Sequence, residues 1–244
     1  MGHHIVAENV SSAWLEAVVF IIKQPNSHCN NLMVDIKNPI SRNINIEQKY
    51  KEFCENNGIK HFSIPANTIF PQKSYQILGN DRKKLYSKYP KLHEVLKGRW
   101  GSYFGQMIGW KLKGSMDEPI NQLEQIITKI NARDKVYRNA YTIQITNPKD
   151  HTSYIRGGPC LHYITLQLER NPKVMNMLAL YRNHDFARKA YGNYVGLGRL
   201  LEFLSKETEF SVGSLTCVSS NAFIDSGFKK GLNGIFGGFT ENAI

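Results

Sequence analysis

Two apolar segments, residues 161–168 and 174–181, constrain the fold of this chain more than any other feature. An Asn-Pro pair stands between them, so the pattern predicts a β-hairpin of two antiparallel strands. A glycine-rich tight turn that ends in Cys160 precedes the first strand, and Arg182 follows the second. A hairpin of this kind places a cysteine and an arginine at the same end of a sheet.

Polar side chains continue directly after the second strand. Arg182, Asn183 and Asp185 supply a cation, an amide and a carboxylate, and Asn193 begins a helix pattern eight residues further on. A cysteine is a natural nucleophile because some thiolate is available near neutral pH. An arginine binds phosphate, and an amide offers a donor and an acceptor that match O4 and N3–H of uracil. The set is typical of covalent chemistry on a phosphorylated, amide-like ring, with a buried and inert Cys160 as the alternative interpretation.

The remaining periodicity predicts an α+β fold, with helices packed against a mixed β-sheet. The segment from residue 226 onwards is rich in glycine and has little periodicity. No internal repeat, linker or low-complexity tract interrupts the chain, which predicts a single domain over residues 1–244. Helices are expected over 12–24, 46–57, 119–131 and 192–205, and strands over 31–37, 61–64, 140–146 and 213–218.

Charge and cysteine content narrow the class of protein. The chain has 31 Lys and Arg against 20 Asp and Glu, and the net charge of +11 favours anionic partners such as nucleotides or nucleic acid. The four cysteines form no CxxC pair and have no zinc-ligand spacing, so we expect free thiols, no bound metal and a cytoplasmic protein. The longest apolar run, residues 17–22, is too short to span a bilayer, so no membrane partner is expected.

Basic residues cluster between positions 81 and 99. Tyr86, Tyr89 and Trp100 are interleaved with them, and nucleic-acid-binding patches have this mixture. A solvated helical face has the same composition and is the interpretation that we favour. A third interpretation is a positive field that steers an anionic substrate.

Several of these motifs resemble the thymidylate synthase family, which includes the pyrimidine nucleotide hydroxymethylases. The Pro-Cys pair at Cys160 is similar to the family's nucleophile motif, and the Arg-Asn-His-Asp sequence of residues 182–185 is similar to its Arg-Ser-x-Asp motif. Asn193 matches the asparagine that reads the base. The resemblance covers roughly residues 100–225 and, more loosely, residues 12–24.

The resemblance implies a thymidylate-synthase-like fold, a homodimer, and one-carbon transfer to carbon 5 of a pyrimidine nucleotide with 5,10-methylenetetrahydrofolate as cofactor. Without the resemblance, Glu16 is a solvated helix carboxylate, Arg138 is a surface charge, and Tyr103 lies in a glycine-punctuated segment typical of a cavity-lining loop. The implied site consists of Cys160 as nucleophile, Glu16 for protons and water, Asn193 for base selection, Arg182, Asn183 and (across the dimer) Arg138 for phosphate, and Asp185 with Tyr103 for the cofactor.

Three positions depart from the family's pattern. Phe223 and Asp225 stand where the family holds the deoxyribose hydroxyl with a histidine and a tyrosine, and Leu161 replaces the histidine after the nucleophile. These changes argue against thymidylate synthase itself. We expect a hydroxymethylase or methylase of a uridine nucleotide. In this enzyme Asp225 either binds the two hydroxyls of a ribose or lies outside the pocket and caps the glycine-rich segment that follows. The competing hypothesis is a scaffold that has lost catalysis and binds a nucleotide or RNA.

Overall fold

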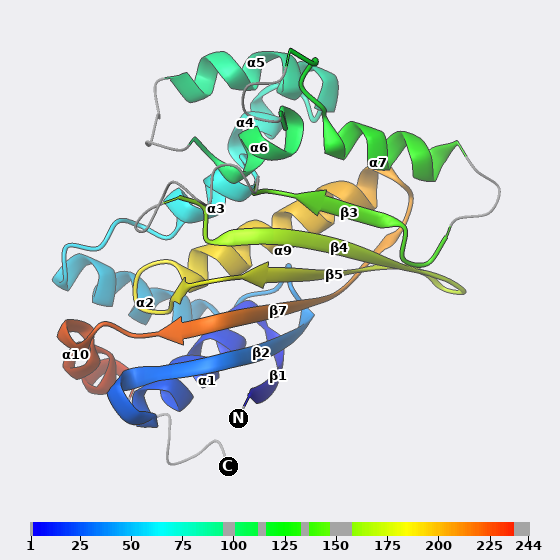
Figure 1. Cartoon of the computed structure of the whole chain (residues 1–244). Helices are drawn as coiled ribbons and strands as arrows, with labels where there is room; N and C mark the ends of the chain where they lie inside the picture. The colour runs from blue at the N-terminus through cyan, green and yellow to red at the C-terminus, as the bar shows by residue number, and fades with distance from the viewer. Residues whose placement is uncertain (1, 95–100, 112–115, 133–136, 147–157, 237–244) are drawn as a thin grey trace.

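A computed structural model of the chain describes residues 2–94, 101–111, 116–132, 137–146 and 158–236. The described strands form one seven-stranded mixed sheet in the order β1-β2-β7-β5-β4-β3, and β6 pairs with β7 (Figure 1). Strands β1 and β2 are parallel, as are β5 and β7, whereas β2–β7, β4–β5 and β3–β4 are antiparallel. The strands are β1 (His3–Asn9), β2 (His28–Asn38), β3 (Tyr141–Gln144), β4 (Leu161–Arg170), β5 (Lys173–Tyr181), β6 (His184–Asp185) and β7 (Ser211–Phe223).

Two long helices cover one face of this sheet. Helix α1 packs on β1 and β2, α9 packs on β5 and β7, and the two helices contact each other behind the sheet in Figure 1. The prediction of a mixed sheet with packed helices is therefore confirmed. The helices are α1 (Val10–Lys23), the 3-10 turn η1 (Pro25–Ser27), α2 (Ile44–Asn56), α3 (Ser63–Ile69), α4 (Gln72–Ile77), α5 (Arg82–Glu94), α6 (Tyr103–Ile108), α7 (Gln122–Asn131), α9 (Ala190–Glu207) and α10 (Ser226–Phe236).

The hydrophobic core lies between the sheet and this helix layer. Side chains alternate between the two faces of each strand, so strand register places alternate residues in common rows. One row that crosses five strands is fully buried. It consists of Val34, Cys217, Ala179, Ile164 and Ile143.

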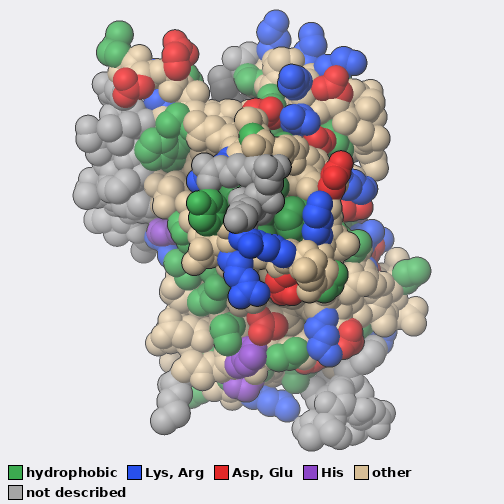
Figure 2. Space-filling model, turned by 90° about the vertical axis from the view of Figure 1, so that its right-hand side faces the viewer, with side chains coloured by type: hydrophobic (Ala, Val, Ile, Leu, Met, Phe, Trp, Pro, Cys, Tyr) green, Lys and Arg blue, Asp and Glu red, His purple; other side chains and the backbone are tan. Residues whose placement is uncertain are grey.

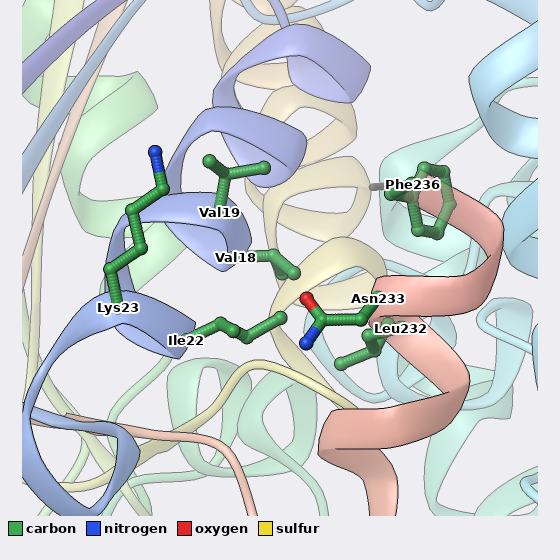
Figure 3. A pocket seen from close by; sticks show the side chains of 7 residues that line it. All are labelled: Val18, Val19, Ile22, Lys23, Leu232, Asn233 and Phe236. Atoms are coloured by element: carbon green, nitrogen blue, oxygen red, sulfur yellow. The ribbon is translucent and has the colours of Figure 1, made fainter. Parts of the chain in front are cut away.

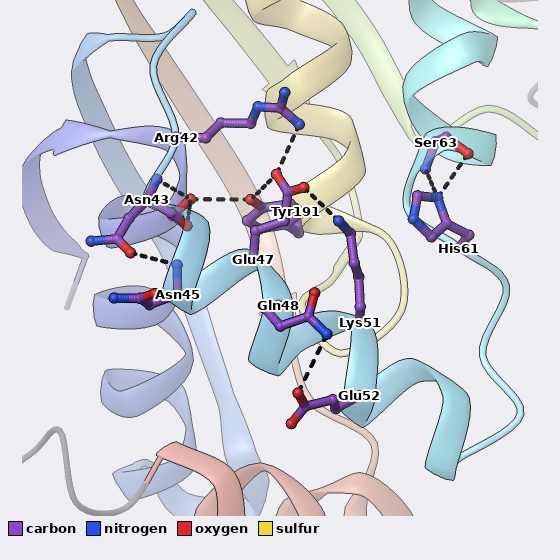
Figure 4. Close-up of polar contacts among 11 residues, drawn as sticks. Arg42, Asn43, Asn45, Glu47, Gln48, Lys51, Glu52, His61, Ser63 and Tyr191 are labelled. Atoms are coloured by element: carbon purple, nitrogen blue, oxygen red, sulfur yellow. Dashed lines mark hydrogen bonds and ion pairs between the residues drawn. The ribbon is translucent and has the colours of Figure 1, made fainter.

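The start of α9 is tied to α1 and α2 by a polar network. The hydroxyl of Tyr191, in the first turn of α9, donates to Glu47 Oε2 at 3.1 Å and lies 3.1 Å from Ser11 Oγ. Figure 4 shows Glu47 between this tyrosine, Arg42 at 2.8 Å and Lys51 at 2.9 Å. Burial alone raises the pKa of Glu47, but the bond to Lys51 and the two cations outweigh burial and lower it. The network holds the N-terminal turns of α9 in place.

Two predicted segments have a different structure. The strand predicted over 61–64 is wrong, because this segment leads into α3, which packs against α9. A Cβ on Gly192 of α9 would lie 2.4 Å from the carbonyl oxygen of Phe62, a close approach that local periodicity does not reveal. The glycine-rich segment from residue 226 forms α10 instead of an irregular tail. Its Phe236 ring packs on Trp14, with centroids 5.3 Å apart, and this long-range contact compensates for weak helix propensity.

The N-terminal part of the chain has more regular structure than predicted. The edge strand β1 was not expected from its sequence, and it forms by parallel pairing with β2. Helix α1 begins two residues before the predicted start at 12. Asn9 caps it, and its Oδ1 accepts hydrogen bonds from the backbone N–H groups of Ser11 and Ser12.

The basic segment forms α5 at the top of the molecule, where Figure 2 shows Lys and Arg side chains gathered. Arg82 pairs with Glu124 at 2.8 Å and with Glu207 at 2.6 Å, so this cation links α5 to α7 and α9. Tyr86 is half-buried and Tyr89 is buried, so their rings are not presented as stacking platforms for bases. This arrangement agrees with a solvated basic face on an amphipathic helix. Trp100, Lys97 and Arg99 lie outside the described residues.

Candidate active site

Cys160 and Arg182 meet at the end of the sheet where β4 begins and β5 ends, on the left in Figure 1. The carbonyl oxygen of Cys160 accepts a hydrogen bond of 2.9 Å from the backbone N–H of Arg182. The Nε of Arg182 donates to the carbonyl oxygen of Pro159 at 3.2 Å. The predicted hairpin is therefore confirmed, and it makes the cysteine and the arginine neighbours.

Cys160 differs from the other three cysteines in its exposure. It is half-buried, whereas Cys29, Cys54 and Cys217 are buried, and all four thiols are free. Burial raises the pKa of Cys29 and Cys217, and it raises the pKa of Cys54 to about 11. A thiolate is disfavoured at those three positions, so Cys160 is the thiol best placed to react with a ligand.

Tyr103 supports the loop that carries Cys160. Its hydroxyl oxygen accepts hydrogen bonds from the backbone N–H groups of Cys160 at 3.2 Å and Leu161 at 3.3 Å. The side chain is buried, and burial raises its pKa to about 12. The expected cavity-lining loop is instead the start of helix α6 at this residue. Tyr103 therefore acts on the backbone of the candidate nucleophile.

Asn183 is oriented by a second asparagine on β7. Its Oδ1 accepts a hydrogen bond of 2.8 Å from Asn221 Nδ2. The Oδ1 of Asn221 in turn lies 3.3 Å from Nδ1 of His28, whose ring stacks on Phe223 with centroids 5.7 Å apart. Asn183, which is predicted to bind phosphate, is therefore linked through Asn221 and His28 to Phe223, which stands at the predicted sugar position.

Asp185 closes the turn between β6 and α9. Its Oδ1 accepts from the backbone N–H groups of Ala187 at 3.1 Å and Arg188 at 3.0 Å, and its Oδ2 pairs with the guanidinium of Arg188. Arg188 also reaches Asp225 at 3.8 Å and covers the ring of Phe228 at 5.4 Å. One arginine therefore joins the two predicted carboxylates. Sequence reasoning missed Arg188, although its i+3 spacing from Asp185 was a readable signal.

Asn193 is held by a histidine that the sequence analysis did not single out. The Nδ2 of Asn193 lies 3.1 Å from His184 Nε2, and His184 Nδ1 lies 2.9 Å from Ser219 Oγ. All three side chains are buried. Burial and the charge of Lys189 lower the pKa of His184 to about 3, so the imidazole is neutral.

Lowering the pH from 7 to 5 is expected to destabilise the protein through His184. An unfolded histidine titrates near about 6.5, well above the folded pKa of about 3, so only the unfolded state gains this proton at pH 5. The contribution of neutral His184 to the free energy of unfolding is therefore complete above about pH 6.5 and is lost as the pH falls towards 3. The loss at pH 5 is about 2 kcal/mol.

Urea unfolding of wild type and His184→Phe at both pH values measures this contribution. The free energy of unfolding of the variant is expected to fall by about 2 kcal/mol less than that of the wild type, because phenylalanine takes up no proton. Equal losses in the two proteins would show that His184 titrates normally in the folded state.

The hydroxyl of Tyr181 is a buried polar atom beside Cys160. It has no hydrogen-bond partner among the described residues, and burial raises its pKa well above the usual range, with a further contribution from Cys160. A buried hydroxyl without a partner is costly unless a ligand or water satisfies it.

In the part of the chain that the structure describes, the side chains of Glu16 and Arg138 make no hydrogen bond or ion pair with this cluster. Glu16 lies on the exposed side of α1, and partial burial raises its pKa. Arg138 is exposed beside the far end of β4, where its carbonyl oxygen accepts from the backbone N–H of Leu168. Leu168 lies eight positions after Cys160, a separation of about 27 Å along a strand. The roles predicted for these two residues remain predictions.

Two surface hollows lie outside the predicted site. One, of about 210 Å³, includes Arg42 and Arg199 among its lining residues. The other, of about 130 Å³, lies between α1 and α10 (Figure 3). The residues that line this second hollow are Val18, Val19, Ile22, Lys23, Leu232, Asn233 and Phe236. None of the site residues predicted from the sequence lines either hollow.

The fold and the site define a mixed-sheet protein with a cysteine–arginine pair at one end of its sheet. The chain is distantly related, over nearly its full length, to archaeal proteins named "Putative thymidylate synthase". It is 24% identical over 224 residues to the protein of Methanosarcina mazei, 23% to that of Methanosarcina acetivorans and 22% to that of Methanococcoides burtonii. Each alignment covers 92% of this chain and 90% of the relative.

No family model matches the chain. Within the described residues, no helix has the length and apolar character that a bilayer crossing requires. The relationship to the archaeal proteins therefore rests on the full-length alignments.

Proposed function

We propose that this chain transfers a one-carbon unit to carbon 5 of a pyrimidine nucleotide, as a single domain with a thymidylate-synthase-like fold. The observation that carries the proposal is the backbone hydrogen bond between Cys160 and Arg182, since it places a half-buried thiol and a candidate phosphate-binding cation at the same end of the sheet. The names of the distant archaeal relatives support the same reaction class.

The reaction begins at Cys160. Its thiolate bonds to carbon 6 of the ring, and the electron pair of the C5–C6 double bond moves onto the C4 carbonyl oxygen as an enolate. Carbon 5 is then nucleophilic and takes up a proton or a one-carbon electrophile, and 5,10-methylenetetrahydrofolate supplies this electrophile when bound. In exchange without the cofactor, loss of the original C5 hydrogen as a proton and departure of the thiolate restore the ring double bond. In one-carbon transfer the folate nitrogen would also have to leave the transferred carbon, and water would then give a hydroxymethyl group whereas hydride would give a methyl group. Arg182 binds the phosphate.

Asn183 and Asp225 contact the phosphate and the ribose in this proposal. The bond from Asn221 presets the side chain of Asn183. Asp225 is half-exposed and stands directly before α10, where its carbonyl oxygen accepts from the backbone N–H of Phe228. Its carboxylate lies 3.8 Å from Arg188, so a ribose would share this acceptor with an arginine. Asn193 selects the base, with uracil preferred.

Asp185 is the described residue that can hold the folate ring. A carboxylate has about four acceptor positions, and the two oxygens of Asp185 already accept three hydrogen bonds. One position is left for an N–H donor of the pterin. The hydroxyl of Tyr103 is directed at the backbone of Cys160 and Leu161, so its contribution to cofactor binding is through that loop.

A homodimer would cover the open face of the sheet and supply Arg138 in trans. The face opposite α1 and α9 carries a row of side chains that are half-buried or exposed: Met33, Val218, Leu180, Tyr163 and Gln144. Arg138 is exposed, and its backbone is hydrogen-bonded to Leu168, which lies about 27 Å along β4 from Cys160. Arg138 therefore cannot serve the site of its own chain. Sheet-to-sheet pairing of two copies is the arrangement that we propose.

Tritium release from carbon 5 tests the proposed function. Wild-type protein is incubated with the 5-tritiated monophosphates of uridine, deoxyuridine, cytidine and deoxycytidine, with and without 5,10-methylenetetrahydrofolate. Uridine monophosphate is expected to release tritium fastest, and to do so without the cofactor, because only addition of Cys160 is required. With the cofactor, mass spectrometry distinguishes a methyl from a hydroxymethyl product. Binding without tritium release from any substrate would favour a nucleotide- or RNA-binding scaffold instead.

A further inference from the structure

Three buried polar side chains form a chain of hydrogen bonds behind the candidate site. Asn193 Nδ2 lies 3.1 Å from His184 Nε2, and His184 Nδ1 lies 2.9 Å from Ser219 Oγ. The exposed fractions are 4% for Asn193, 1% for His184 and 0% for Ser219. These groups are almost entirely shielded from bulk water, so they depend mainly on one another for hydrogen bonding.

Aromatic rings hold the imidazole of His184 in one orientation. It stacks on Tyr181, with centroids 4.1 Å apart and an interplanar angle of 5°. The ring of Tyr194 meets it edge-on at 5.8 Å, and the ring of Phe186 lies 5.0 Å away. His184 therefore cannot turn away from Asn193 without disrupting the packed core.

The direction of the hydrogen bonds follows from the neutral state of this ring. A neutral imidazole has one donor and one acceptor nitrogen. Because the amide nitrogen of Asn193 faces Nε2, Nε2 is the acceptor and Nδ1 carries the proton, which it donates to Ser219 Oγ. This arrangement leaves the amide oxygen of Asn193 on the side away from His184.

We propose that His184 is a positioning residue that fixes which end of the Asn193 amide faces the base, and thereby sets the choice between uracil and cytosine. The inference rests on the proposed function, in which Asn193 reads the base. An amide that rotates by half a turn exchanges its donor and acceptor, so a free amide pairs with either base. Rotation of the Asn193 amide by half a turn would require a new tautomer of His184 and a reversed Ser219 hydroxyl at the same time. The amide is therefore held in the orientation that pairs with one base.

Calorimetric titration with uridine and cytidine monophosphates tests this role. The wild type is expected to prefer uridine monophosphate by about tenfold, the discrimination typical of a fixed bidentate contact. His184→Phe keeps an aromatic ring on Tyr181 but has no acceptor for the amide, and the Kd ratio is expected to fall to within about twofold. Ser219→Ala removes the partner of Nδ1 and is expected to lower the ratio by a smaller factor. This milder change provides the test if His184→Phe does not fold.

Two controls separate positioning from general damage. Tyr194→Phe removes a buried hydroxyl that has no hydrogen-bond partner among the described residues and keeps the edge-on ring, so the Kd ratio is expected to equal that of the wild type. Ribose 5-phosphate, which lacks a base, is expected to bind the wild type and all three variants equally. Nitrogen-15 NMR of the free protein is expected to show a neutral His184 with the proton on Nδ1.

The outcomes distinguish this inference from the function on which it rests. If neither these monophosphates nor their deoxy forms bind the wild type, the proposed function is wrong and the inference falls with it. If the wild type discriminates and the folded variants keep the same ratio, only the inference is overturned. A proton on Nε2 of His184, or equal affinity of the wild type for the two bases, overturns it as well.

Discussion

Cys160→Ala is expected to abolish tritium release from carbon 5, with a loss of at least about 1,000-fold, or roughly 4 kcal/mol of transition-state stabilisation. Among the described residues, Cys160 is the one thiol next to Arg182. An alanine at this position cannot form the bond to carbon 6. Nucleotide affinity is expected to stay within about tenfold, because Arg182 and the backbone bond at position 160 are retained. Exchange kinetics and calorimetry with uridine monophosphate measure the two quantities separately.

A second cysteine variant is the matched control for this experiment. Cys54 lies in α2 and is buried, and burial raises its pKa to about 11, so its thiol is poorly suited to act as a nucleophile. Cys54→Ala is expected to keep full exchange activity after correction for folded protein. Undiminished exchange in Cys160→Ala would contradict the covalent mechanism, whatever the outcome at Cys54.

Gly198→Ala is expected to destabilise the protein by about 3 kcal/mol. A Cβ on Gly198, in the middle of α9, would lie 2.1 Å from the carbonyl oxygen of Pro39 and 2.9 Å from its carbonyl carbon. Both atoms belong to the backbone after β2, so either α9 or this connection must move. The gain of about 1 kcal/mol in helix propensity does not offset such an overlap. Urea unfolding measures the loss, and the melting temperature is expected to fall by roughly 6–12 °C.

Gly234→Ala in α10 is the matched control, because a Cβ there would have no heavy atom within 4 Å. Only the higher helix propensity of alanine affects this variant, so its free energy of unfolding is expected to rise by up to about 1 kcal/mol. A Gly198→Ala protein as stable as wild type would show that α9 and the Pro39 backbone are further apart than the structure places them.

The hairpin and its two polar ends could be predicted from the sequence, because they depend on local signals. Alternation with period two, a turn between the strands, and the positions of Cys160 and Arg182 just outside them lead directly to their contact. The same holds for the long amphipathic helices, whose apolar residues recur at helical spacing. Glu16 is a further example, since helical spacing alone places it on the exposed side of α1 and the structure does the same.

Contacts between distant parts of the chain could not be predicted in this way. Ser219 reaches His184 because β7 runs parallel to β5 and β6, and this pairing is not encoded in the periodicity of either segment. Arg188 meets Asp225 only because β7 ends beside the turn before α9. Helix α10 forms from a glycine-rich segment because Phe236 packs on Trp14, a contact across most of the chain.

The sequence by itself determined the alternation of the strands, the amphipathic helices and the placement of Cys160 beside Arg182, since each depends on neighbours within one hairpin or one helix. Only the tertiary structure decided which buried polar groups face one another: Tyr103 on the backbone of Cys160, and Ser219 and His184 behind Asn193. The physical reason is that a buried polar group must find its partner in space, and the order of strands in the sheet, which sets those partners, is a property of the whole chain.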